Sequence, residues 1–256
     1  MDPLLSTQNL TISINNTKVT KSLDLEVQRG QCWGILGQNG IGKSTLLKTI
    51  AGLREADSGD IKIDGKMIKT ENTVAHAKNI GVLFQEYHDA FPGTVLETAL
   101  TGRHPYLKPW QWETKSDFDI AQQALELMGL QSLADRSIKT LSGGERQRLE
   151  IAMVLTQDPE LFLLDEPTNH LDLRHQIIIL DLLKSLCGTK NKTAIMILHD
   201  VNLVNRYCDH VLLLYGNGDT EHGTKAEKLN PERLSVLYGH PISEFQQSKK
   251  KIYLPS

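Results

Sequence analysis

A glycine-rich run, Gly37-Gln38-Asn39-Gly40-Ile41-Gly42-Lys43-Ser44, constrains the fold of this chain more than any other stretch. It satisfies the pattern G-x-x-x-x-G-K-[ST], and it lies between a continuous apolar run at 32–36 and a helical pattern at 45–51. The glycines allow successive backbone N–H groups to turn inward and hold an anion at a helix N-terminus. Lys43 can then reach the β and γ phosphates of a nucleotide, and Ser44 can offer its hydroxyl to magnesium. The run therefore predicts a phosphate-binding loop in an α/β protein.

Size and charge narrow the remaining possibilities. The chain has 256 residues, of which 39% are hydrophobic and 23% charged, which suits one large α/β domain or one domain with a subdomain. A net charge of −3 gives no electrostatic reason to expect nucleic acid as a partner, because its binders usually carry a basic face. Cys32, Cys187 and Cys208 are far apart and include no C-x-x-C, which favours a reducing cytosol over a disulfide framework or a zinc site.

The chain shows neither an N-terminal signal nor an apolar run near the ~20 residues that span a bilayer. We therefore expect it to be neither secreted nor membrane-spanning by itself.

Two kinds of apolar pattern predict two kinds of strand. Cys32–Leu36, Leu161–Leu164 and Thr193–Leu198 are continuous apolar runs, which are typical of parallel strands buried on both faces. Apolar and polar residues alternate around Leu10–Ile14 and Leu23–Val27, which is typical of antiparallel strands with one face in water. We therefore expect a P-loop NTPase sheet core preceded by an N-terminal antiparallel β region.

The β region and the middle of the chain carry two further signals. Asp64-Gly65 lies between short strand patterns and predicts a hairpin. Ser116 to Leu130 predicts a helix that Ser116 caps and Gly129 ends. Its expected apolar face comprises Phe118, Ala121, Leu125 and Met128. We interpret residues 90–160, roughly, as a helical subdomain inserted into a single domain that spans 1–256.

Two carboxylates, Asp165 and Glu166, end the buried run Leu161–Leu164. Burying both without partners would be costly, so at least one should face a cation or a polar pocket. Asp165 fits the aspartate with which P-loop NTPases hold magnesium, and Glu166 is then positioned to accept a proton from attacking water. Alone, two acidic residues after an apolar run could equally be surface charge; the phosphate loop favours the catalytic interpretation.

Two more polar residues follow predicted strands. His199 comes after Thr193–Leu198 and should lie at the same edge of the sheet as the carboxylates. A lone histidine is more often structural than catalytic, but this position favours a catalytic role. Gln85 follows an apolar run at 80–84, and by itself it would be an exposed loop glutamine.

The stretch Leu-Ser-Gly-Gly-Glu at 141–145 opens another helical pattern. Ser142 and Glu145 have the spacing of a capping box. That leaves Gly143 and Gly144 unexplained, because each glycine inside a helix costs about 1 kcal/mol relative to alanine. We interpret the glycines as allowing another group to approach the backbone at the helix N-terminus.

Taken in order, these motifs and Leu171-Asp172 resemble the ATP-binding-cassette family over almost the whole chain. The resemblance implies ATP and Mg²⁺ as cofactors. ATP would be held by Gly37, Gln38, Asn39, Gly40, Ile41, Gly42, Lys43, Ser44 and Thr45. Ser44, Gln85 and Asp165 would hold magnesium, and Glu166, His199 and Gln85 would be catalytic.

The family also implies that two copies meet head to tail as a homodimer. Ser142, Gly143, Gly144 and Glu145 of each copy would cap the γ-phosphate held by the other, since a helix N-terminus favours an anion. Asp172 would lie in a loop at the dimer interface. The group that approaches the glycines would then be another subunit's ATP.

Three segments, 91–97, 101–107 and 231–242, resemble the ATPase subunits of bacterial importers for ferric siderophores, haem and cobalamin. This implies integral membrane permease subunits as partners, indirectly a substrate-binding protein, and a peripheral place on the cytoplasmic face of the cell membrane. Tyr87, His88 and Phe91 are our hypothesis for the groove that receives a permease helix. The alternative is a soluble cassette ATPase of an assembly pathway such as iron–sulfur cluster assembly, and residues 91–107 favour the importer.

Three segments do not follow directly from this resemblance. Ile14 stands where the family usually stacks an aromatic ring on adenine, so the base preference is open. For Trp110 and Trp112 we favour packing within the helical subdomain over contact with a partner. The lysine-rich tail from Ser248 is expected to be a solvated end.

Overall fold

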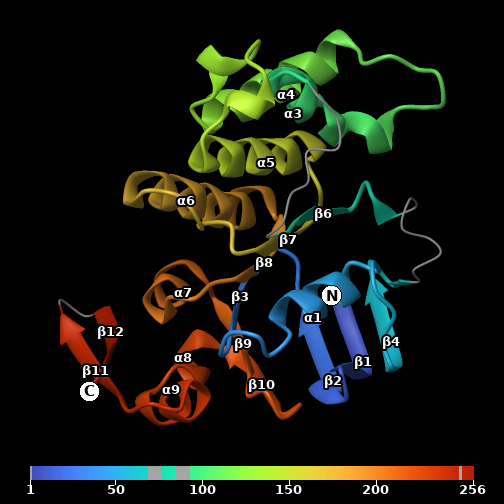
Figure 1. Cartoon of the computed structure of the whole chain (residues 1–256). Helices are drawn as coiled ribbons and strands as arrows, with labels where there is room; N and C mark the ends of the chain where they lie inside the picture. The colour runs from blue at the N-terminus through green and yellow to red at the C-terminus, as the bar shows by residue number, and fades with distance from the viewer. Residues whose placement is uncertain (1, 69–75, 85–92, 248–249) are drawn as a thin grey trace.

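A six-stranded sheet lies at the centre of the molecule (Figure 1). The computed structural model describes residues 2–68, 76–84, 93–247 and 250–256. The sheet has the order β10-β9-β3-β8-β7-β6, and all neighbours are parallel except β10 and β9. Its strands are β3 (Cys32–Leu36), β6 (Ile80–Leu83), β7 (Leu161–Asp165), β8 (Thr193–Ile197), β9 (His210–Leu214) and β10 (Thr220–Thr224).

Burial on both faces explains the continuous apolar runs. Every residue of β3, β7 and β8 is buried, which confirms the prediction for these strands. Along β3, Cys32 and Leu36 belong to the core that includes the helical part, whereas Trp33 and Ile35 belong to the core under the N-terminal β region. Because neighbouring residues of a strand point to opposite faces, each face here needs its own apolar set.

A second, antiparallel sheet packs against this core, as predicted. It has the order β2-β1-β4-β5. Its strands are β1 (Leu5–Ile14), β2 (Thr17–Val27), β4 (Ser58–Ile63) and β5 (Lys66–Met67). Asp64 and Gly65 both have positive φ, 52° and 71°, and they form the predicted turn between β4 and β5.

The helical part lies at the top of Figure 1, where α3, η2 and α4 pack against α5. The segments of this part are α3 (Val95–Leu100), η2 (Thr101–Tyr106), α4 (Lys115–Leu127), η3 (Gln131–Leu133), η4 (Ile138–Thr140) and α5 (Gly143–Gln157). The remaining helices are α1 (Lys43–Ile50), α6 (Leu173–Lys190), α7 (Val201–Tyr207), α8 (Lys225–Lys228) and α9 (Pro231–Tyr238).

Helix α4 corrects the predicted N-terminus. Thr114, and not Ser116, is the N-cap, because its hydroxyl accepts from the Asp117 N–H while the Asp117 carboxylate accepts from the Thr114 N–H. Gly129 ends the helix as predicted, with φ 65° and the Leu130 N–H bonded to the Leu125 carbonyl. Phe118 is exposed, whereas Ala121, Leu125 and Met128 are buried as expected.

The C-terminal tail is not a solvated end. It forms the hairpin of β11 (Ile242–Gln247) and β12 (Lys250–Pro255). Tyr253 is only 3% exposed within the main core. The prediction was wrong because the lysine run obscured the short apolar stretch that follows it.

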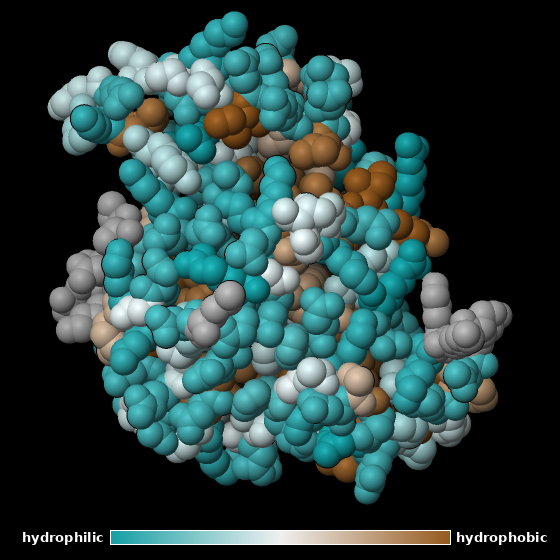
Figure 2. All heavy atoms as spheres, turned by 180° about the vertical axis from the view of Figure 1, so that it is seen from behind, coloured by the Kyte–Doolittle hydropathy of each residue, from teal (hydrophilic) through white to brown (hydrophobic). Residues whose placement is uncertain are grey.

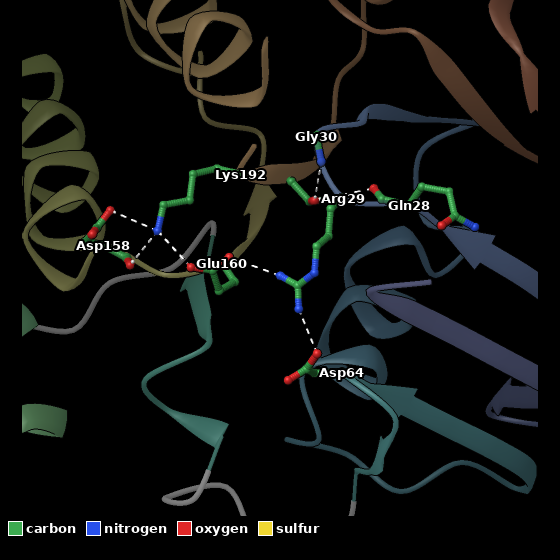
Figure 3. Close-up of polar contacts among 8 residues, drawn as sticks. Gln28, Arg29, Gly30, Asp64, Asp158, Glu160 and Lys192 are labelled. Carbon is green, nitrogen blue, oxygen red and sulfur yellow. Dashed lines mark hydrogen bonds and ion pairs between the residues drawn. The ribbon is translucent and has the colours of Figure 1, made fainter. Parts of the chain in front are cut away.

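The amino ends of β3, β7 and β8 are joined by ion pairs (Figure 3). Arg29 precedes β3 and binds Glu160 at 3.1 Å and Asp64 at 2.7 Å. Lys192 precedes β8 and lies 3.2 Å from both Glu160 Oε1 and Asp158 Oδ1. This network ties the central sheet to the β4–β5 turn and to the C-cap of α5.

Candidate functional site

The carboxyl ends of β3, β8 and β7 bring the predicted motifs together. Ile35 pairs with Ile197, and Ile197 pairs with Asp165, so the three strands end side by side. The phosphate loop follows β3, Glu166 follows β7 and His199 follows β8. This is the edge at which open α/β sheets bind ligands.

Backbone geometry in the phosphate loop requires glycine at Gly42. Gly42 is the N-cap of α1 with φ 102°, and a Cβ there would come within 2.5 Å of Val19 Cγ2. It would also lie 3.1 Å from Ile14 Cδ1. Ile14 therefore borders the loop, while its contact with adenine stays a prediction.

Lys43 folds over the same loop. Its Nζ donates to the carbonyls of Gly37 at 2.9 Å and Gln38 at 2.8 Å. Burial lowers the pKa of the Lys43 ammonium, and the neighbouring carboxylates Glu166 and Asp165 oppose that shift. A cation with little water around it forms strong charge-assisted bonds to phosphate.

Asp165 has a buried oxygen that the described protein does not satisfy. The residue is 2% exposed, and its Oδ1 has no hydrogen-bond partner among the described residues. Burial raises the pKa of Asp165, against the effect of the Ser44 hydroxyl, which donates to the carboxylate. A carboxylate and a hydroxyl are the hard oxygen ligands that Mg²⁺ takes alongside substrate phosphates, so the residues present fit this ion.

The described residues contain no set of three or more His, Cys, Asp or Glu side chains that could hold a metal unaided. Asp165 and Ser44 would share a magnesium ion with the phosphates of the nucleotide.

Glu166 is held from two sides. His199 Nε2 lies 2.6 Å from Oε1, and the Asn169 amide donates to Oε2. Glu166 itself has φ 53°, an uncommon value for a residue other than glycine, which turns the chain so that the Asn169 N–H meets the Glu166 carbonyl. Asn169 was missed from the sequence, although a polar residue three positions after an acid in a Pro-containing turn was a usable signal.

Gln85 lies outside the described residues, as do Tyr87, His88 and Phe91 of the proposed permease groove. The roles predicted for them stay predictions.

The Leu-Ser-Gly-Gly-Glu stretch at 141–145 begins α5 as predicted. Ser142 is the N-cap and forms a full capping box with Glu145. The Ser142 N–H and hydroxyl both donate to the Glu145 carboxylate, and these two bonds lower its pKa. The two glycines differ: a Cβ on Gly143 would meet nothing within 4 Å in the described part of the chain, whereas one on Gly144 would lie 3.1 Å from the His170 carbonyl. Gly143 thus borders open space, and Gly144 allows close packing.

Asp172 is exposed and caps α6. Its carboxylate accepts from the His175 N–H at 2.9 Å and contacts His175 Nδ1 at 2.9 Å. Those bonds lower the pKa of Asp172.

The packing expected for Trp110 and Trp112 is wrong. Their side chains are 100% and 86% exposed. Residues 108–111 form a turn in which the Gln111 N–H donates to the Lys108 carbonyl and the Gln111 side chain accepts from the Lys108 N–H. Trp110, within this turn, has φ 67°. Both indoles therefore point away from the subdomain.

Known proteins match this chain along most of its length. The family model described as ABC transporter matches residues 20–169, more than half of the 256. The petrobactin import ATP-binding protein FpuD of Bacillus anthracis is 40% identical over 91% of this chain and 85% of its own. The ferric enterobactin transport ATP-binding protein FepC of Escherichia coli (strain K12) is 37% identical over 91% and 86%.

Solved structures match the fold. A metal-chelate type ABC transporter in an inward-facing conformation superposes with a TM-score of 0.86 at 30% identity, covering 100% of this chain and 98% of that one. The dimeric ATP-binding cassette MJ0796 bound to ADP and Pi has a TM-score of 0.76 at 26% identity over 86% and 98%. The chain belongs to the ABC transporter family as one of its ATP-binding subunits, and it is an ATPase.

Proposed function

We propose that this ATPase drives the import of an iron chelate of the ferric siderophore class through a membrane permease. Relatives of this chain support that cargo, since they are named for ferric enterobactin transport, iron(3+)-hydroxamate import and siderophore transport. Ferric siderophores are therefore the cargo that we favour within the importer class.

One observation carries the chemistry: Lys43, Asp165 and the Glu166–His199 pair meet at the carboxyl ends of adjacent strands. The backbone of Gly37–Thr45 and the Lys43 ammonium would bind the phosphates of ATP. Ser44 and Asp165, with Gln85, would hold Mg²⁺, which supplies positive charge to the transferred phosphoryl group.

Glu166 is the proposed general base. Both of its oxygens are already engaged, so the carboxylate is held in one orientation by His199 and Asn169. A base fixed in this way accepts the proton of an attacking water without first losing side-chain freedom. His199 would keep Glu166 in place as charge moves to the phosphate.

The proposed active form is a head-to-tail homodimer. Dimeric cassettes are known among the solved structures, and the open space beside Gly143 leaves room for a γ-phosphate. A mixture of Lys43→Ala and Ser142→Arg subunits should then form a heterodimer with one nearly intact site. A heterodimer shown to form, yet no more active than either variant alone, would contradict action in trans.

The proposed location is the cytoplasmic face of the cell membrane, bound to permease subunits that receive cargo from a substrate-binding protein. No helix in the described ranges is long and apolar enough to cross a bilayer. Large hydrophobic side chains that are exposed in the helical part include Trp110, Trp112 and Leu127. In the view from behind, most of the hydrophobic residues that reach the surface lie in the upper half of the molecule (Figure 2). The exposed side chains of Trp110, Trp112 and Leu127 support a contact between a partner and the helical subdomain. We place this subdomain at roughly residues 90–160, within a single domain.

Isolation from native membranes tests the proposal. The tagged full chain should sediment with membranes and co-purify in mild detergent with a polytopic permease. Recovery in the soluble fraction with cluster-assembly proteins would instead support the alternative.

A further inference from the structure

The C-terminal hairpin is bonded to the first turn of the helix that follows His199. The carboxamide of Asn202 pairs with the peptide groups of Tyr253 in both directions: Nδ2 donates to the Tyr253 carbonyl at 3.0 Å, and Oδ1 accepts from the Tyr253 N–H at 2.8 Å. Asn202 thus continues the hydrogen bonding of β12 as a neighbouring strand would.

The same residue is tied to the His199 segment. The Asp200 side chain caps α7 and accepts from the Asn202 N–H at 2.7 Å. Only Leu198, His199 and Asp200 separate β8 from α7. The backbone of Asn202 is therefore held through Asp200, and its side chain is held through the hairpin.

Tyr253 is itself anchored to the core. It is buried, and its hydroxyl donates to the Leu229 carbonyl at 2.8 Å. Burial is the main cause that raises the pKa of Tyr253 to about 12, so the hydroxyl stays a donor at neutral pH. The hairpin therefore gives Asn202 a fixed point of attachment.

His199 needs such support. Its side chain is 43% exposed, and it belongs to neither β8 nor α7. A small movement of α7 would break its 2.6 Å contact with Glu166. Misplacement of a catalytic group by about 1 Å can lower the rate a hundredfold.

We propose that Asn202 is a positioning residue for His199, and that the hairpin of β11 and β12 holds Asn202 in place. This inference rests on the proposed role of His199. A purely structural role for the hairpin is the competing account. A purely structural role predicts that the loss of any hydrogen bond between α7 and the hairpin has the same effect on activity.

Asn205 provides a matched control. It lies one turn further along α7 and also donates to the hairpin, from Nδ2 to the Lys251 carbonyl at 2.9 Å. Asn205→Ala should lower the melting temperature as a lost hairpin bond does, but it should leave kcat within about twofold of the wild type.

The test is a double-mutant cycle on the full chain with Asn202→Ala, His199→Ala and the combination. We expect Asn202→Ala to lower kcat about three- to tenfold, with the calorimetric affinity and stoichiometry for ATP unchanged. In the His199→Ala background it should cause no further loss, because the two residues act through one contact. Hydrogen exchange at 198–201 should rise in Asn202→Ala and not in Asn205→Ala.

Other results would overturn the proposal. An equal loss in both backgrounds, an equal loss of kcat in Asn205→Ala, or no change in kcat and exchange for Asn202→Ala would each do so. If His199→Ala alone keeps full activity, the proposed role of His199 fails instead. If residual activity in that background is too low to measure, the exchange result decides.

Discussion

Strand β7 has a glutamate just beyond each of its ends, and the two glutamates have opposite surroundings. Glu160, before the strand, is half exposed and forms ion pairs with Arg29 and Lys192. Glu166, after the strand, is buried and bonded to His199 and Asn169. Both cations that pair with Glu160 come from this chain (Figure 3).

The same contrast holds for the two edges of the sheet. At the amino edge, Asp64, Asp158 and Glu160 all form ion pairs. At the carboxyl edge, Asp165 keeps a buried oxygen that no described residue satisfies. Buried polar groups are normally satisfied. Asp165 thus differs from the three amino-edge carboxylates, and we expect a ligand to complete it.

The largest expected difference between the two ends of β7 is in turnover. Glu166→Gln should lower kcat by about 10²- to 10⁴-fold, because an amide is no general base. ATP affinity should persist, since the amide is nearly isosteric. Steady-state ATPase assays and calorimetry measure the two quantities.

Glu160→Gln is the matched control for that variant and should keep kcat. The Glu166→Gln protein should form a dimer with ATP and magnesium that ADP does not support. Rapid hydrolysis by Glu166→Gln would exclude Glu166 as the base.

The sequence predicted the carboxyl edge better than it predicted the periphery. Continuous apolar runs mark strands buried on both faces, and polar residues directly after them must share one edge, so the placement of Asp165, Glu166 and His199 followed from pattern alone. Chain order carried that information because each site residue adjoins its strand.

Contacts across long sequence distances were not predictable in this way. Asn202 meets Tyr253 only because β12 folds back on α7, and the lysines before β12 obscured its apolar residues. Thr114 replaced Ser116 as a cap because both positions precede acceptable helix formers and only the side-chain geometry with Asp117 distinguishes them. The exposure of Trp110 depends on a loop conformation that composition does not specify.

Two lysines extend the comparison to nucleotide binding. Lys43→Ala should weaken ATP binding by about 10- to 100-fold, because a hydrogen bond to a charged group contributes about 1.5–3 kcal/mol. Lys192→Met removes the same charge from the amino edge and should leave the calorimetric affinity unchanged. Equal affinities for wild type and Lys43→Ala would contradict the phosphate site.

Neutralising Asp165 and neutralising Asp64 should affect the melting temperature differently. Burial raises the folded-state pKa of Asp165 above its ordinary value, so at neutral pH the nucleotide-free protein carries a costly buried charge. Asp165→Asn should therefore raise its melting temperature at pH 7. The difference should shrink as pH falls through the raised pKa, and it should vanish below the ordinary value, where both states of the wild type are protonated.

Melting curves with and without ATP and magnesium measure this effect. The stabilisation by nucleotide should be smaller in Asp165→Asn than in the wild type, because a magnesium ligand is lost. Asp64→Asn, which breaks the pair with Arg29, should lower the melting temperature or leave it unchanged. A destabilised Asp165→Asn protein at pH 7 would show that the carboxylate is satisfied after all.

The smallest effect, on the melting temperature, is expected when the ion pairs of Lys192 or Arg29 at the amino ends of the strands are broken. Lys192 is 10% exposed, but its partners Asp158 and Glu160 are 62% and 44% exposed, so solvent screens much of the attraction. Lys192→Met should cost about 1 kcal/mol, or about 2–4 °C in melting temperature for a chain of this size. Arg29→Met should cost less, because Arg29 itself is 36% exposed. Unchanged melting of Lys192→Met would show that packing, and not these ion pairs, joins the amino ends of the strands.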